Sequence, residues 1–203
     1  MNDLQSYYQH YRANITYDNN FEAAHGWETP DGQVDCPILD SPFMIKCTTS
    51  DGAVYDSEQV WLTKFFGTLH PRNNSGQLSG ALINFDQTEF NSAQALMDTN
   101  GYVFVPTACQ QGKRCRLVVA LHGCNQTQAQ IGIEWVTEAG IDEWADTNDI
   151  IVLYPYNVQV ATTSGDDDQG CWDWWGYTGS NYPYKSGLQM ASIKAMVDRI
   201  TGR

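Results

Sequence analysis

Two short apolar runs constrain this chain most, because each has the composition of a strand that is buried on both faces. Leu117 to Leu121 (LVVAL) and Ile150 to Tyr154 (IIVLY) consist mainly of aliphatic and β-branched residues, which is typical of strands covered by helices on either side. The residues between them, from about 128 to 148, are predicted to be helical. A strand, a helix and a second strand predict a parallel pair with a right-handed crossover. The chain is therefore expected to be an α/β protein, and 203 residues fit one domain.

Weaker patterns predict the other elements. Periodicity and turn residues indicate an amphipathic helix over 1–14, a short strand over 14–17 and a loop-rich segment over 18–49. A helix capped by Asp51 and ending at Phe66 follows, and then a strand over 101–106. The last helix is predicted from a capping box formed by Ser186 and Gln189.

Composition excludes several classes of protein. The chain has 24 acidic and 11 basic residues, and its net charge of −13 would repel nucleic acids and anionic membranes. Its 7 Trp, 11 Tyr and 7 Phe exclude intrinsic disorder. No apolar run is long enough to span a bilayer. We expect no metal and no cofactor.

Six cysteines without a Cys-x-x-Cys pair indicate disulfides in an oxidising compartment rather than a zinc site. Spacing alone suggests one of several possible connectivities: Cys36–Cys47, Cys109–Cys115 and Cys124–Cys171. Residues 1–14 lack the basic and apolar regions of a signal peptide. Since an exported protein needs an export signal, the sequence is expected to lack its beginning.

Two segments could carry the chemistry of a hydrolase. Leu121-His122-Gly123-Cys124 ends the first buried run, and in α/β hydrolases a loop after such a strand supplies one backbone N–H of the oxyanion hole. An ordinary turn is the simpler interpretation. His25 is a candidate general base, because imidazole can accept a proton near neutral pH; a structural loop histidine is the alternative. The other two histidines with no supporting context are interpreted as structural: His10 and His70.

A third segment, GCWDWWGY, holds three tryptophans within four residues: Trp172, Trp174 and Trp175. They could line a cleft for an apolar polymer or stack on sugars, or they could fill the core beneath a loop. Asp166-Asp167-Asp168 lacks the EF-hand pattern and is predicted to be a solvated loop rather than a calcium site.

The chain has no candidate nucleophile. No serine stands in Gly-x-Ser-x-Gly, the elbow that exposes a serine at the top of an α/β-hydrolase sheet. The nearest candidate, Ser79 in GQLSG, lies in a turn-rich stretch. The sequence therefore has no complete serine-histidine-aspartate triad.

Four segments give the chain a family resemblance: LHGCNQT and GCWDWWGYTG at this spacing, together with AAHGWETPDG and CPILDSPFMIKC. It resembles the C-terminal part of an extracellular poly(3-hydroxybutyrate) depolymerase of the circularly permuted type, which is an α/β-hydrolase serine esterase. The resemblance runs through almost the whole chain. It implies a partial α/β-hydrolase fold with a mostly parallel sheet and flanking helices, in which residues 1–203 form the C-terminal portion of one catalytic domain.

The resemblance also implies roles for individual residues. His25 matches the catalytic histidine, and Cys124 matches the residue whose backbone N–H forms part of the oxyanion hole. The three tryptophans correspond to the substrate crevice, with Trp175 the foremost contact. The three cysteine pairs suggested above agree with the disulfides of the family, which implies that Cys124 is oxidised to Cys171. The implied partner is a polyester or oligoester substrate, with no nucleic acid and no membrane.

In this family type, the serine and then the aspartate precede the histidine. Both would lie before Met1, and Asp3 is not nominated as the triad acid. We therefore expect the chain alone to be inactive. The missing N-terminal segment would also supply the nucleophile-bearing strands, so we expect open sheet edges and a poorly folded or aggregating chain. Two alternatives are a polymer- or carbohydrate-binding module that uses the tryptophan cluster, and a thiol hydrolase that pairs Cys124 with His25.

Overall fold

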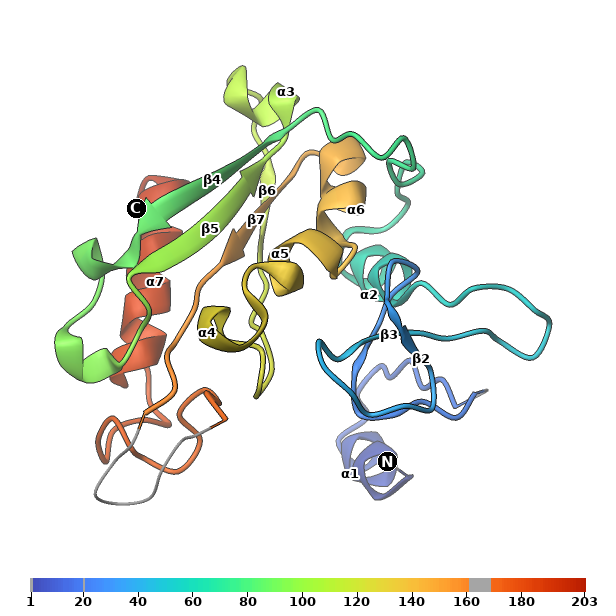
Figure 1. Ribbon diagram of the computed structural model, residues 1–203, viewed down its shortest axis with the longest axis horizontal. Helices are drawn as coiled ribbons and strands as arrows, with labels where there is room; N and C mark the ends of the chain where they lie inside the picture. Colours follow the sequence, from blue (N-terminus) through green and yellow to red (C-terminus); the bar gives the residue numbers. More distant parts are fainter. Residues whose placement is uncertain (1, 20, 161–168) are drawn as a thin grey trace.

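A four-stranded sheet forms the centre of the computed structural model, which describes residues 2–19, 21–160 and 169–203. The strands lie in the order β4-β5-β7-β6. Their bounds are Ala81–Asp86 for β4, Asn100–Val105 for β5, Arg116–Val119 for β6 and Ile150–Tyr154 for β7. In Figure 1, helix α7 (Leu188–Thr201) lies on one side of this sheet, and helices α5 (Glu134–Glu138) and α6 (Ile141–Asn148) lie on the other.

The predicted strand-helix-strand unit is confirmed. Strands β6 and β7 are parallel, with Val118 opposite Val152. The connection between them contains three short helices rather than one, because α4 (Gln128–Ile131) ends at Gly132 and α5 is separated from α6 by Gly140. Both glycines have positive φ, of 63° and 75°, a conformation that interrupts a right-handed helix.

The expectation of a mostly parallel sheet is wrong. Strand β5 is antiparallel to both of its neighbours, β4 and β7. Between β5 and β6 lies only a short connection with the four-residue helix α3 (Thr107–Gln110), whereas a parallel pair needs a crossover of about a dozen residues or more. The sheet is therefore mixed, and the protein remains an α/β fold.

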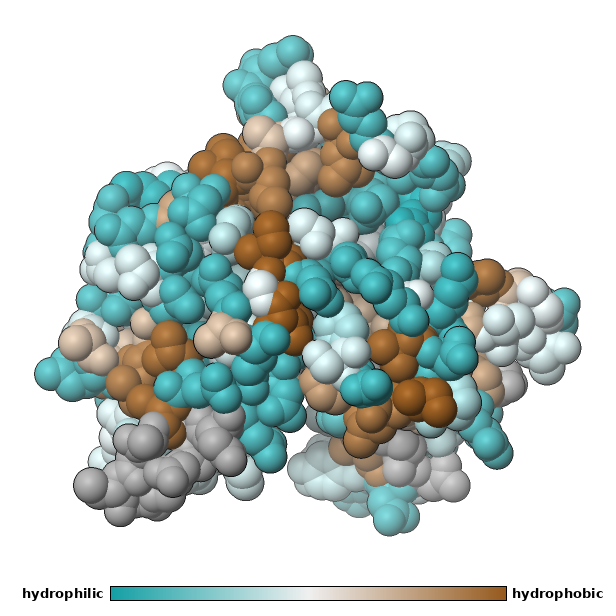
Figure 2. All heavy atoms as spheres, viewed as in Figure 1, coloured by the Kyte–Doolittle hydropathy of each residue, from teal (hydrophilic) through white to brown (hydrophobic). Residues whose placement is uncertain are grey.

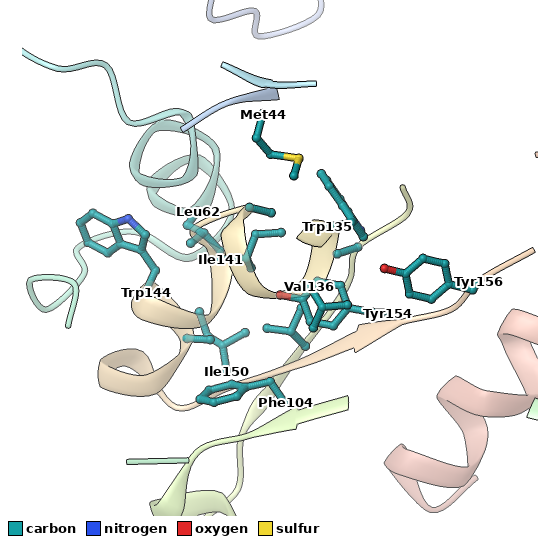
Figure 3. Packing of buried hydrophobic residues seen from close by; sticks show 14 of the residues in the cluster. Met44, Leu62, Phe104, Trp135, Val136, Ile141, Trp144, Ile150, Tyr154 and Tyr156 are labelled. Carbon is teal, nitrogen blue, oxygen red and sulfur yellow. The ribbon is translucent and has the colours of Figure 1, made fainter. Parts of the chain in front are cut away.

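A second, smaller sheet lies in the segment that was predicted to be loop-rich. Its strands are β1 (Trp27–Glu28), β2 (Val34–Asp35) and β3 (Met44–Lys46), all parallel and in the order β1-β3-β2. These strands are too short for sequence periodicity to reveal them. Figure 3 shows the Met44 side chain of β3 directed toward Trp135 of α5, which joins this sheet to the main core.

Three boundary predictions are wrong. Residues 14–17 form no strand. Helix α2 (Ser57–Phe66) is capped by Asp56 rather than Asp51, since the Asp56 side chain accepts a hydrogen bond from the Gln59 N–H at 2.8 Å. Helix α7 begins after Gly187 without a side-chain cap, because the Gln189 side chain instead binds the Asp173 N–H at 2.8 Å. The N-terminal helix is confirmed as α1 (Asn2–His10), and Gly67 ends α2 as predicted.

The main core lies between the sheet and the helices α2, α5 and α6 (Figure 3). Its buried members come from elements far apart in sequence: Leu62, Phe104, Trp135, Val136, Ile141, Trp144, Ile150, Val152, Tyr154 and Tyr156. The opposite face of the sheet packs on α7, where Met196 is 1% exposed. The chain thus buries its main core on one face of the sheet and further apolar side chains on the other.

Among the described residues, no further strand pairs with the outer side of β6. Strand β6 is the last strand in the order and is half-buried rather than covered on both faces. Beside it lies an apolar groove of about 730 Å³ whose walls include Trp61, Phe65 and Leu117, and the Phe65 side chain is 70% exposed. Figure 2 shows apolar side chains gathered in a band along one face of the molecule, with polar side chains on both sides. Among the described helices, none is long and apolar enough to span a membrane.

Candidate active site

A cavity of about 450 Å³ separates the N-terminal segment from the turn that follows β6. His25 and Cys124 both line it, so the structure brings together the two residues that the sequence nominated for chemistry. The remaining walls come from the same two segments, from α5 and from one residue between β7 and α7: Gly26, Trp27, Leu39, Phe43, Leu121, His122, Gly123, Asn125, Gln126, Trp135 and Gln169.

Backbone hydrogen bonds hold the His25 loop against the small sheet. The Ala24 N–H donates to the Cys36 carbonyl at 2.8 Å, and the Trp27 N–H donates to the Phe43 carbonyl at 2.8 Å. Gly26 permits this close approach, since a Cβ there would lie 2.9 Å from the Phe43 carbonyl oxygen. The imidazole of His25 is exposed. Among the described residues, no carboxylate makes a hydrogen bond to this ring.

The turn after β6 carries Cys124. Gln126, which is 4% exposed, accepts a hydrogen bond from the Gly123 N–H at 2.7 Å and donates one to the Pro42 carbonyl at 2.8 Å. One side chain therefore connects the turn with the segment that leads into β3. The disulfide to Cys171 holds Cys124 from the other side.

The Cys124 N–H is available for a ligand. Cys124 lines the cavity, and no described residue accepts a hydrogen bond from its N–H. A backbone donor without a protein acceptor at a cavity wall has the chemistry of an oxyanion-binding group.

His122 is the buried residue that the sequence analysis did not single out. Its side chain is 2% exposed, and burial lowers the pKa of the imidazole to about 4. The ring stacks on Tyr156 with centroids 5.0 Å apart. Its place in LHGC, two residues before Cys124, was the available signal. The contacts of the ring, however, depend on residues distant in sequence.

The tryptophan cluster lies beside this cavity rather than in its wall. The half-buried Trp172 donates a hydrogen bond from Nε1 to the His122 carbonyl at 3.0 Å. Trp174 is 69% exposed and makes an edge-to-face contact with Trp175 at 5.1 Å. The tryptophans that do line the cavity are Trp27 and Trp135, which the sequence analysis did not nominate.

All three predicted disulfides are confirmed: Cys36–Cys47, Cys109–Cys115 and Cys124–Cys171. No free cysteine remains. The thiol-hydrolase alternative is therefore wrong, because a disulfide-bonded Cys124 has no thiolate to attack with.

The other polar residues considered above lie elsewhere. Ser79 donates a hydrogen bond to the Asp146 carboxylate at 2.7 Å, so it is not paired with a histidine. His10 lies on α1 against Tyr11, and His70 bonds Asn148 through its backbone. The triplet Asp166-Asp167-Asp168 lies outside the described residues. Within the described part of the chain, no group of three metal-binding side chains occurs.

No protein-family model matches the chain. It is, however, 40% identical over 205 residues to the poly(3-hydroxybutyrate) depolymerase of Delftia acidovorans, a match that covers 99% of this chain and 39% of the relative. It is 37% identical over 199 residues to the polyhydroxybutyrate depolymerase of Talaromyces funiculosus, covering 93% of this chain and 56% of the relative.

Solved structures agree with these sequence matches. The crystal structure of the PHB depolymerase from Penicillium funiculosum superposes with a TM-score of 0.84 at 34% identity, covering 100% of this chain and 65% of that chain. A PHB depolymerase complexed with an R3HB trimer also gives a TM-score of 0.84, at 33% identity, with 99% of this chain and 65% of that chain covered.

The mixed sheet, its flanking helices and the disulfide-held cavity define an α/β protein of the depolymerase type. By sequence and by fold, the chain belongs to the poly(3-hydroxybutyrate) depolymerase family. It spans 39% and 56% of the length of the two curated relatives.

Proposed function

We propose that this chain forms the histidine- and oxyanion-bearing part of a serine esterase that hydrolyses poly(3-hydroxybutyrate) or a related short-chain polyester. In the complete enzyme a serine hydroxyl attacks the ester carbonyl while His25 accepts its proton. The Cys124 N–H stabilises the negative charge on the carbonyl oxygen. His25 then returns the proton to the departing alcohol, and water hydrolyses the acyl-enzyme by the same steps.

One observation carries this proposal: His25 and the unpaired Cys124 N–H line the same cavity. A general base and an oxyanion donor must both reach one carbonyl group. The proposal is specific because His25 and Cys124 come from separate segments, which only the fold brings to one cavity.

The serine and the aspartate are proposed to come from sequence outside these residues. Residues 1–203 would then be the C-terminal portion of one circularly permuted catalytic domain, consistent with the partial coverage of the relatives. The open edge of β6 and its apolar groove offer a place for further strands to pair. The chain alone is accordingly proposed to be inactive and to self-associate through this edge.

Substrate contact and location are part of the same proposal. The exposed Trp174 and the half-buried Trp175 offer aromatic surface to an apolar polymer, and a related depolymerase is known in complex with an R3HB trimer. Trp172 is assigned a supporting role because its indole N–H is already bound to His122. Three disulfides support an extracellular location.

A chimera tests the catalytic assignment. The chain replaces its matching region in the Delftia acidovorans depolymerase, and the product, called here the completed enzyme, is assayed with p-nitrophenyl butyrate. We expect His25→Ala to lower kcat by about 10⁶, with His10→Ala as the matched control that leaves kcat unchanged. An active completed enzyme whose rate survives His25→Ala would contradict the proposal, as would substantial turnover by the chain alone.

The alternative of a non-catalytic binding module rests on the exposure of Trp174. It predicts that the chain binds insoluble polyester or cellulose and that Trp174→Ala and Trp175→Ala abolish retention. Binding assays with granules of each polymer test this alternative, because retention of both variants at the level of the unsubstituted chain rules out the cluster as a binding surface.

A further inference from the structure

We propose that His122 is a positioning residue, whose buried ring holds the Gly123–Cys124 peptide so that the Cys124 N–H faces the cavity. This inference rests on the proposed function, in which that N–H binds the oxyanion. His122 itself has no role as a proton acceptor from substrate, because both of its ring nitrogens are engaged by the protein.

The key contact joins the ring to the peptide in question. His122 Nδ1 lies 2.8 Å from the Gly123 carbonyl oxygen. This carbonyl and the Cys124 N–H belong to one planar trans peptide, in which the two groups point in opposite directions. Fixing the carbonyl toward the buried ring therefore directs the N–H away from it.

The two partners of the ring define its tautomer. The Gly123 carbonyl can only accept a hydrogen bond, so Nδ1 carries the proton. The Asn157 N–H can only donate, and it points to Nε2 at 3.5 Å. Burial keeps the ring neutral over the neutral pH range, since it lowers the pKa to about 4. A single proton thus stays on the nitrogen that faces the peptide.

Aromatic neighbours fix the plane of the ring. Tyr156 stacks on it with an angle of 23° between the planes, and Trp172 lies against it with centroids 5.1 Å apart. Trp172 also holds the His122 backbone through its hydrogen bond to the carbonyl oxygen. Asn157 extends the same network, because its side chain donates to the Cys171 carbonyl at 2.8 Å. The ring, the peptide and the Cys124–Cys171 bridge therefore form one connected unit.

Two substitutions separate the hydrogen bond from the packing. His122→Phe keeps an aromatic ring on Tyr156 but removes the donor, whereas His122→Asn places an amide donor near the position of Nδ1. Trp172→Phe is a third variant, which keeps a ring but loses the bond to the His122 carbonyl. All are made in the completed enzyme, with thermal unfolding as the check on folding.

The first readout is the Cys124 amide signal in cysteine-selective ¹H–¹⁵N spectra, and the second is hydrolysis of p-nitrophenyl butyrate. We expect His122→Phe to shift the Cys124 signal and lower kcat by about 10²–10³ with little change in KM, which is the cost of losing one oxyanion donor. His122→Asn is expected to restore the signal and most of kcat, and Trp172→Phe to give a smaller loss of kcat.

The outcomes are distinguishable. A wild-type Cys124 signal in His122→Phe overturns the positioning role, whatever the rate. Equal losses of kcat in His122→Phe and His122→Asn overturn it as well, since the donor would not matter. A shifted signal in His122→Phe with unchanged kcat upholds the positioning role and instead refutes the oxyanion role of Cys124 in the proposed function.

Discussion

Glu58 makes the stability of this fold depend on pH in a direction opposite to that of most carboxylates. The residue lies in the first turn of α2 and its side chain is fully buried. Burial raises the pKa of its carboxyl group from 4.5 to about 9, and the nearby Asp56 charge adds to the increase. Glu58 is therefore protonated in the folded chain at neutral pH and ionised in the unfolded chain.

The sign and size of the effect follow from proton linkage. Between the unfolded pKa near 4.5 and the folded pKa of about 9, the folded state holds one proton that the unfolded state has lost. The contribution of Glu58 to the free energy of unfolding has its full value below pH 4.5. It falls by about 1.4 kcal/mol per pH unit between pH 4.5 and about 9. From pH 5.5 to 7.5 the loss is about 3 kcal/mol.

Glu58→Gln replaces the protonated acid by a neutral amide of similar size and should remove this slope. Urea unfolding of the oxidised chain at low protein concentration, followed by tryptophan fluorescence, measures the free energy of unfolding at several pH values. Asp142, whose pKa burial also raises, contributes equally to both proteins, so only the difference between them matters. Glu22→Gln changes an exposed glutamate and is the matched control. Parallel pH curves for wild type and Glu58→Gln would refute the reasoning.

Three other perturbations test how the site and the edge at β6 are held. Replacing the Cys124–Cys171 bridge, which closes 47 residues, by two alanines should lower the free energy of unfolding by about 4 kcal/mol on the loop-entropy estimate, as measured by urea unfolding; no loss would contradict it. Gly26→Ala should force the His25 loop away from the Phe43 carbonyl, so kcat of the completed enzyme should fall; an unchanged kcat would contradict this. Phe65→Glu should shift the chain alone toward monomer in light scattering, since Phe65 is exposed beside the open edge; unchanged association would exclude this groove.

Sequence patterns predicted those parts of the fold that depend on local composition. The apolar run at β7 and the strand at β5 were recognisable because each is dominated by residues that favour buried strands. The direction of β5 was not, because strand pairing is decided by connections and tertiary packing. The small sheet also escaped prediction, since strands of two or three residues leave no periodic pattern.

Part of the candidate site was likewise predictable from the sequence, and part was not. The sequence nominated His25 and Cys124 through short motifs and a family resemblance, and the fold places them in one cavity. It could not indicate that the His122 ring binds the adjacent peptide, since that geometry requires Tyr156, Asn157 and Trp172 to converge from separate segments. Nor could it indicate that the Trp172 indole N–H is directed at a backbone carbonyl; the assignment of Trp172 to the substrate crevice stays a prediction.

These contacts bear on how much of the catalytic geometry this chain holds by itself. An oxyanion donor is effective only if it is already oriented before the charge develops. Here His122 binds the Gly123 carbonyl, Gln126 accepts a hydrogen bond from the Gly123 N–H, and a disulfide holds Cys124. Gln126 also connects this turn to Pro42 beside β3, the strand against which the His25 loop packs. Because every one of these restraints lies within the described residues, the orientation proposed for the Cys124 N–H needs no contact from outside this chain.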